Sequence, residues 1–198
     1  MTITASLVKD LRERTGVGMM ECKKALAATN GDIEKATEVL RTQGLSRASE
    51  KSGRAAKQGI IYSYIHPGDQ LGVLLELDCE TDFVARTDDF RGLAKHLAMQ
   101  VAATNAQAVD RESVDPALIE RERAILTEQA RSTGKPEAIL AKIVEGKIDK
   151  YYEEICLLEQ PTIRDPERKV KDLVDQAVAK LGENIVVRRF AKFRIGEN

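Results

Sequence analysis

Few side chains in this sequence could carry out catalytic chemistry. There are two histidines, His66 and His96, and they do not form the HExxH pair of a zinc hydrolase. The sequence also lacks a GxxxxGK[ST] phosphate loop and a GxSxG nucleophile turn. We therefore expect no catalytic residue, no metal site, no cofactor and no enzyme activity.

The number and spacing of the cysteines argue against both a metal site and disulfides. They lie far apart, their number is odd and no two form a CxxC pair: Cys22, Cys79 and Cys156. Zinc sites and disulfide frameworks need closely spaced or evenly numbered cysteines. We expect three buried thiols and a reducing compartment.

One short segment stands out as a candidate binding site, Thr81-Asp82-Phe83-Val84. It follows a strand, Leu71 to Glu80, in which apolar residues alternate with acidic ones. Thr81 is suited to cap the turn that follows the strand. Two interpretations of Phe83 are open from the residues alone: it folds back into the core, or it projects as an anchor for a partner.

The elements before this segment predict a small helical module. Apolar residues recur at helical spacing up to about residue 45, with breaks at Thr15–Gly18 and at Asn30-Gly31. We predict a three-helix module over residues 1–45 that is similar to a ubiquitin-associated domain. Residues 46–58 are rich in Arg and Lys and predict a helical linker, either a basic contact strip or a solvated connector.

Residues 59–198 predict an α+β core domain. A hairpin of Gly59–Ile65 and Leu71–Glu80 surrounds the turn residues His66–Gln70. Helical patterns follow at 88–104, at 116–132, from Pro136, and from Asp165-Pro166 to Gly182. The closing strand, residues 185–195, must pair with the hairpin because a lone strand leaves its backbone groups unpaired. This gives a three-stranded antiparallel sheet packed on helices.

Charge and hydropathy limit the possible partners. The formal net charge is -1, which argues against a protein whose affinity comes from neutralising phosphates. We expect no direct nucleic-acid binding. The start of the sequence lacks the pattern of a signal peptide, and no apolar run could span a bilayer, so we expect a cytoplasmic protein without a membrane partner.

Two of these segments resemble the signature motifs of one family. Cys79–Ala85 and Leu7–Leu26 are similar to motifs of bacterial elongation factor Ts, and Asn30–Glu34 continues the second one. Ser132–Pro136 and Val144–Lys147 resemble the later helical region of that family. The resemblance covers nearly the whole chain, with the motifs in the family's order.

The resemblance implies a guanine nucleotide exchange factor for elongation factor Tu, which it would bind both with GDP and free of nucleotide. The family inserts a segment matching Thr81, Asp82, Phe83 and Val84 between helices of the partner and disturbs its Mg²⁺ site. In the family, the positions matching Arg12, Met19 and Met20 contact the partner's nucleotide domain.

The length of the chain is similar to that of the family's short form. It has room for one core subdomain and shows no coiled-coil heptads, and short members build the missing half as a homodimer. His66 resembles a partner-facing histidine of long members, with an ordinary exposed turn histidine as the alternative.

Two other classes of function remain open from the sequence. One is an adaptor that binds small domains through residues 1–45. The other is an RNA-associated translation protein that uses the basic residues at 47–57 and 188–194, and steep salt dependence of binding would identify it.

Overall fold

The structure is a computed structural model that describes residues 3–132 and 136–197, without the side chains of Leu45, Arg47 and Ala138. Thr133–Lys135, part of one motif quoted above, and the Arg47 side chain of the basic linker therefore lie outside the described part. The chain forms two compact units. The first comprises the chain up to Ile60 with Leu77–Leu93 and Asp172–Val186, and the second comprises Ile61–Glu76, Ala94–Lys171 and the chain from Val187.

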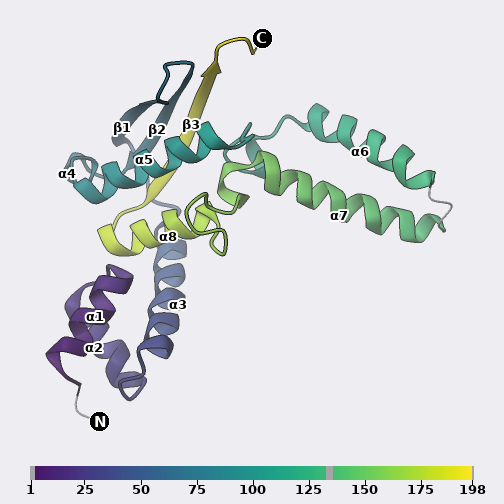
Figure 1. Ribbon diagram of the computed structural model, residues 1–198. Coiled ribbons are helices and arrows are strands. Elements are labelled where there is room, and N and C mark those ends of the chain that lie inside the picture. Colours follow the sequence, from purple (N-terminus) through teal and green to yellow (C-terminus); the bar gives the residue numbers. More distant parts are fainter. Residues whose placement is uncertain (1–2, 133–135, 198) are drawn as a thin grey trace. The chain divides into compact units, whose positions relative to one another are not determined.

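Three helices, α1 (Ala5–Thr15), α2 (Met19–Ala28) and α3 (Ile33–Lys51), pack together in the first unit (Figure 1). The Thr4 hydroxyl caps α1 and the Asp32 carboxylate caps α3. Gly16 ends α1 with φ +68°, a left-handed conformation that favours glycine. The helices predicted for this segment are therefore confirmed.

The core of these helices is small and aliphatic. Its buried side chains follow the predicted helical faces: Val8, Leu11, Cys22, Ala25, Leu26, Ala36 and Leu40. Helix α3 continues to Lys51, so the first part of the basic segment belongs to that helix. The division into residues 1–45, 46–58 and 59–198 stays a prediction.

A three-stranded sheet contains β1 (Gln58–Ile65), β2 (Leu71–Cys79) and β3 (Ile185–Arg194) in the order β1-β2-β3 (Figure 1). The tight turn between β1 and β2 uses positive φ at Gly68 and Asp69. Alternate side chains of β2 are buried as predicted: Val73, Leu75, Leu77 and Cys79. The α+β fold and the pairing of the last strand with the hairpin are both confirmed.

The other side of the sheet is less polar than the sequence suggested. Glu76 is half-buried and its carboxylate accepts a hydrogen bond from Arg189 at 2.6 Å. Four large apolar side chains are nevertheless exposed on these strands: Ile61, Ile65, Leu74 and Phe193. The acidic residues of β2 are therefore only part of the exposed surface of these strands.

The helices after β2 are α4 (Asp82–Ala85) and α5 (Asp88–Ala103), followed by α6 (Pro116–Arg131) and α7 (Glu137–Ile155). Short 3₁₀ turns lie at Arg111–Ser113 and Leu157–Glu159. The amphipathic face predicted for α5 is buried: Phe90, Leu93, Leu97 and Val101.

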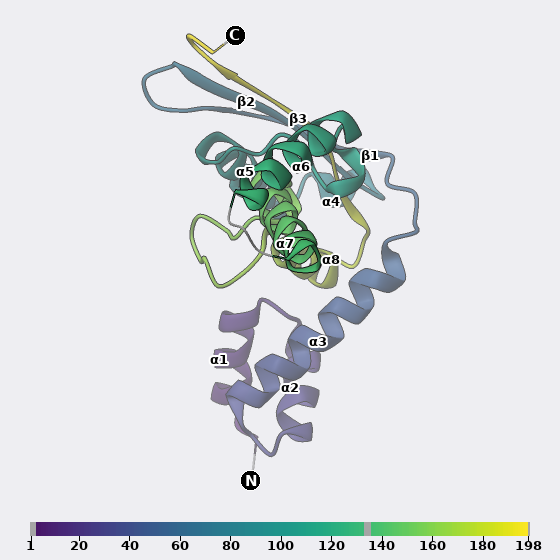
Figure 2. The same ribbon diagram turned by 90° about the vertical axis from the view of Figure 1, so that its right-hand side faces the viewer.

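Helices α6 and α7 lie side by side as a hairpin (Figures 1 and 2). Their facing side chains form a separate apolar cluster that includes Ile119, Leu126, Val144 and Ile148. The sequence predicted the two helices but not their pairing. Each helix has too few apolar contact positions to form several heptads in a row, which is the sequence pattern by which a coiled coil is predicted.

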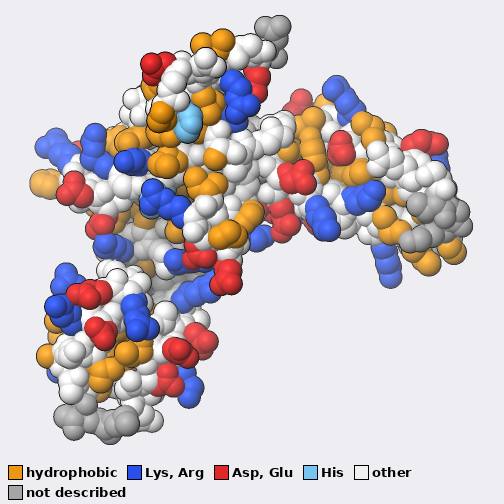
Figure 3. Space-filling model, in the orientation of Figure 1, with side chains coloured by type: hydrophobic (Ala, Val, Ile, Leu, Met, Phe, Trp, Pro, Cys, Tyr) orange, Lys and Arg blue, Asp and Glu red, His pale blue; other side chains and the backbone are white. Residues whose placement is uncertain are grey.

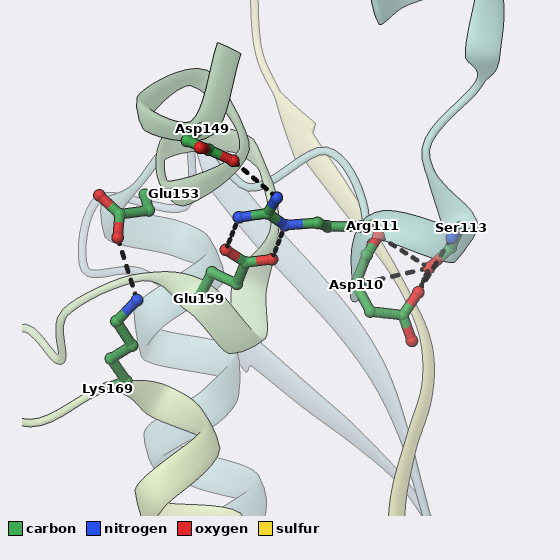
Figure 4. Close-up of polar contacts among 7 residues, drawn as sticks. All are labelled: Asp110, Arg111, Ser113, Asp149, Glu153, Glu159 and Lys169. Atoms are coloured by element: carbon green, nitrogen blue, oxygen red, sulfur yellow. Dashed lines mark hydrogen bonds and ion pairs between the residues drawn. The ribbon is translucent and has the colours of Figure 1, made fainter. Parts of the chain in front are cut away.

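Arg111, in the 3₁₀ turn before α6, bonds to the last part of α7 and to the 3₁₀ turn that follows it (Figure 4). Its guanidinium donates to the two carboxylate oxygens of Glu159 at 2.5 and 2.7 Å, and to Asp149 at 2.8 Å. It also lies 4.6 Å from the centre of the Tyr152 ring. The hydrogen bonds from Arg111 lower the pKa of Glu159, because they stabilise its charged form.

The prediction that a helix begins at Asp165-Pro166 was wrong. Helix α8 spans Val170–Leu181, and the preceding residues form a closed loop. In that loop the Arg168 N–H donates to the Asp165 carbonyl at 3.0 Å, and the Thr162 N–H donates to the Arg168 carbonyl at 2.8 Å. These bonds use the backbone groups around Pro166 for a turn instead of a helix.

Candidate partner-binding site

The most distinctive site begins where β2 ends, at Thr81. The Thr81 N–H and hydroxyl donate to the two oxygens of the Glu183 carboxylate, at 3.0 and 2.6 Å. The same hydroxyl oxygen accepts a hydrogen bond from the Val84 N–H at 3.4 Å and so caps α4. The predicted capping role of Thr81 is confirmed, and Glu183 is an additional partner that the sequence did not indicate.

The carbonyl of Thr81 is also hydrogen-bonded. It accepts from the Cys79 thiol at 3.1 Å and from the Ala85 N–H at 3.3 Å. Burial, together with the nearby negative charge of Glu183, raises the pKa of the Cys79 thiol to about 11. The thiol therefore keeps its proton at neutral pH and remains a donor, so every polar group of Thr81 has a partner.

Phe83 is held on this fixed turn and points into solvent. It is 82% exposed, the highest value among the exposed large hydrophobic side chains that the structure describes. Ala85 is buried and Val84 half-buried, so the other side of α4 rests on the protein. The core interpretation of Phe83 is wrong for the free protein, and its projection into solvent is confirmed.

Asp82 lies at the first position of α4, beside Phe83. Its carboxylate accepts a hydrogen bond from Arg86 at 2.8 Å, one helical turn later, and both side chains are largely exposed. An exposed pair of this kind is worth little energy. Arg86 therefore holds the Asp82 carboxylate only weakly.

A second set of predicted residues lies on α1 and α2. Met19 is 46% and Met20 66% exposed, although the later positions Cys22 and Leu26 of the same helix are buried. Arg12 is exposed on α1. The first unit thus contains both this set and the Thr81–Val84 segment.

His66 belongs to the other compact unit, in the turn between β1 and β2. It is exposed, and its Nδ1 lies 3.0 Å from the Tyr64 hydroxyl. It is thus the one predicted site residue that does not belong to the first unit.

Candidate metal sites and membrane-spanning helices are both absent from the described residues. Residues 3–132 and 136–197 contain no group of three or more His, Cys, Asp or Glu that could hold a metal ion. Within that same part, no helix is both long and apolar enough to cross a membrane. On the face drawn in Figure 3, acidic and basic side chains are intermixed over the hairpin and over α1–α3.

Known proteins are similar in sequence to this chain over nearly its whole length. The family described as elongation factor TS matches residues 27–197, which include the Thr81–Val84 segment. The chain belongs to the elongation factor Ts family. Elongation factor Ts of Thermoanaerobacter sp. (strain X514) is 55% identical over 195 residues, covering 98% of this chain and 96% of that protein.

Other elongation factor Ts proteins are equally similar. That of Thermodesulfovibrio yellowstonii is 55% identical over 197 residues, covering 100% of this chain and 98% of that protein. That of Nitratidesulfovibrio vulgaris is 55% identical over 196 residues, covering 99% of this chain and 98% of that protein. These alignments extend over α1 and most of α2, whereas the family match begins at Ala27, near the end of α2.

Proposed function

We propose that this protein is a translation elongation factor that promotes release of GDP from elongation factor Tu. Membership of the elongation factor Ts family supports the role and the partner. The observation that carries the proposed mechanism is Phe83, a large aromatic side chain that is 82% exposed on a turn fixed by hydrogen bonds. Exposed aromatic side chains at a rigid position are typical binding hot spots.

The proposed mechanism is a wedge. Thr81, Asp82, Phe83 and Val84 insert into the nucleotide domain of the partner and displace groups around its Mg²⁺. Mg²⁺ requires near-octahedral geometry with short bonds, so a small shift of one ligand weakens nucleotide binding. By linkage, the free protein binds nucleotide-free elongation factor Tu more tightly than the GDP complex, by the factor by which it weakens GDP binding.

Rigidity of the segment makes the wedge efficient. Each polar group of Thr81 already has a partner in the free protein, so little backbone freedom remains to be lost on binding. The energy of burying Phe83 is then available to displace the partner's groups.

Arg12, Met19 and Met20 provide the second contact in this proposal. Two exposed methionines next to a buried helix face form an apolar surface that adapts to its partner. This contact holds the two proteins together while the wedge acts. Since the exchange breaks no covalent bond, the protein acts as a binding factor without a cofactor and is not an enzyme.

We further propose a cytoplasmic homodimer. Ile61, Ile65, Leu74 and Phe193 expose apolar surface on the sheet, and a hollow of about 460 Å³ lies between Ile65 and Phe193 at Gly72. Such patches mark interaction surfaces, and a closed twofold pair is the commonest way to cover one. His66, beside this surface in sequence, is proposed to face elongation factor Tu.

The test is the rate of labelled GDP release from elongation factor Tu at saturating protein. We expect a large increase that is insensitive to moderate salt. An unchanged GDP off-rate would contradict the proposed function, and a steep loss of binding with salt would favour the RNA-associated alternative.

A further inference from the structure

Glu183 lies in the turn between α8 and β3 and connects it to the start of the wedge segment. One of its oxygens accepts from two successive backbone N–H groups, those of Glu80 at 3.1 Å and Thr81 at 3.0 Å. The other accepts from the Thr81 hydroxyl at 2.6 Å. We propose that Glu183 is a positioning residue for nucleotide exchange, which fixes the backbone that presents Phe83. This inference rests on the proposed function.

The bond to the Thr81 hydroxyl determines how α4 begins. By donating its proton to Glu183, the hydroxyl directs a lone pair to the Val84 N–H at 3.4 Å. The order of contacts thus runs from Glu183 through Thr81 to Val84. Without the carboxylate, the hydroxyl can rotate and donate elsewhere, and the cap of a four-residue helix weakens.

The turn that carries Glu183 is itself held by the strand end. The Asn184 N–H donates to the Glu80 carboxylate at 2.7 Å, so each segment uses a side chain to bind the backbone of the other. Asn184 is 4% exposed, and its side-chain amide donates to the Arg54 carbonyl at 2.7 Å. Gly182 ends α8 with φ +78°, which lets the chain turn toward Glu80.

Glu183 is bound to the segment by charge-assisted hydrogen bonds, which are about twice as strong as neutral ones. It is half-buried and its oxygens are directed at Thr81 and Glu80, so its effect on exchange runs through the segment and not through contact with the partner. A double-mutant cycle can test whether Glu183 acts through the segment, because removal of Glu183 should then change exchange only while Phe83 is present.

The experiment compares Glu183→Ala and Glu183→Gln with Glu153→Ala as a matched control. Glu153 is a glutamate that is also paired, with Lys169 at 3.0 Å, but lies in the other compact unit. Amide hydrogen exchange is measured in the free protein at Thr81 and Val84, and GDP release from elongation factor Tu is titrated with each variant.

Glu183→Ala is expected to speed amide exchange at Thr81 about tenfold and to lower the saturating GDP-release rate by about the same factor. The half-saturating concentration should change less than the maximal rate, because α1 and α2 keep their contact. Glu183→Gln retains a carbonyl acceptor and should give an intermediate effect. In a Phe83→Ala background, Glu183→Ala should add less than about twofold, since the two residues act as one unit.

Unchanged amide exchange at Thr81 in both Glu183 variants would overturn the inference, as would faster amide exchange with a fully retained release rate. Should Glu183→Ala fail to fold, Glu183→Gln gives the same comparison. If the unmodified protein does not release GDP, the proposed function fails. The amide-exchange result then separately decides whether Glu183 orders the segment.

Discussion

Replacing Phe83 by alanine separates a wedge from a core residue. A phenylalanine side chain presents about 200 Å² of surface, and 82% exposure leaves about 36 Å² of it buried in the free protein. At about 25 cal/mol per Å², Phe83→Ala should reduce the free energy of unfolding by about 1 kcal/mol at most. The surface that remains, about 160 Å², could contribute up to about 4 kcal/mol on full burial in a partner.

The matched control is Phe90→Ala, seven residues further along the chain. Phe90 is fully buried on α5, so its truncation should cost about 3–5 kcal/mol of unfolding free energy. Thermal unfolding and the affinity for nucleotide-free elongation factor Tu are measured on both variants. For Phe83→Ala we expect a nearly unchanged melting temperature and an affinity lower by about 2 kcal/mol or more, about 30-fold.

The reverse pattern would refute this reasoning. If Phe83→Ala unfolded as readily as Phe90→Ala and its folded fraction bound and exchanged normally, Phe83 would be a structural residue. Asp82→Ala should follow Phe83→Ala with a smaller effect, because it removes a charge without removing apolar area.

Three further predictions concern other parts of the chain. Met19→Ala with Met20→Ala should weaken partner binding while the melting temperature stays close to its original value, as measured by calorimetry and thermal unfolding; a variant that unfolds instead would indicate core roles. Phe193→Asp should convert a homodimer to a monomer in sedimentation at tens of micromolar, and a monomer before substitution would contradict the dimer. Burial is the main cause that raises the pKa of the Cys79 and Cys156 thiols from 9.0 to about 11, so the folded chain keeps protons that the unfolded chain loses. This stabilisation is complete below pH 9 and is lost as the pH rises toward 11, by up to about 3 kcal/mol per thiol. Urea unfolding across that range should show a shallower decline when both cysteines are alanine, and equal slopes would refute the assignment.

Local patterns were sufficient for much of the fold. The spacing of Leu7 and Leu11 predicts one face of α1, and the alternation from Val73 to Cys79 predicts the buried face of β2. These signals are reliable because neighbours in sequence determine which side of a helix or strand is apolar. The cap at Thr81 was recognisable for the same reason.

Contacts between distant segments were not recognisable. Glu183 bonds to Thr81 across 102 residues, and nothing in its neighbourhood marks it as more than a turn residue after Gly182. Pro166 suggested the start of a helix, but the loop bond from Thr162 to Arg168 takes those backbone groups. In both cases a tertiary contact outweighs the local preference.

The side-chain exposure of Phe83 also required the structure. A single phenylalanine after a strand is compatible with core or surface, and the sequence alone favours the core. The ring turns outward because Ala85 takes the buried side of α4 and hydrogen bonds hold Thr81 in place. The resemblance to a family therefore predicted which residues form the candidate site, and the fold determined how they are arranged.

The most direct test of the central claim is GDP release from an excess of elongation factor Tu by a substoichiometric amount of this protein. Elongation factor Tu is loaded with fluorescent GDP and mixed with unlabelled GDP, and the loss of fluorescence is followed with time. We expect complete release at a rate proportional to the amount of protein, because each molecule acts on many partners in turn. Release that stops at one GDP per molecule added, or proceeds at the spontaneous rate, would contradict the account.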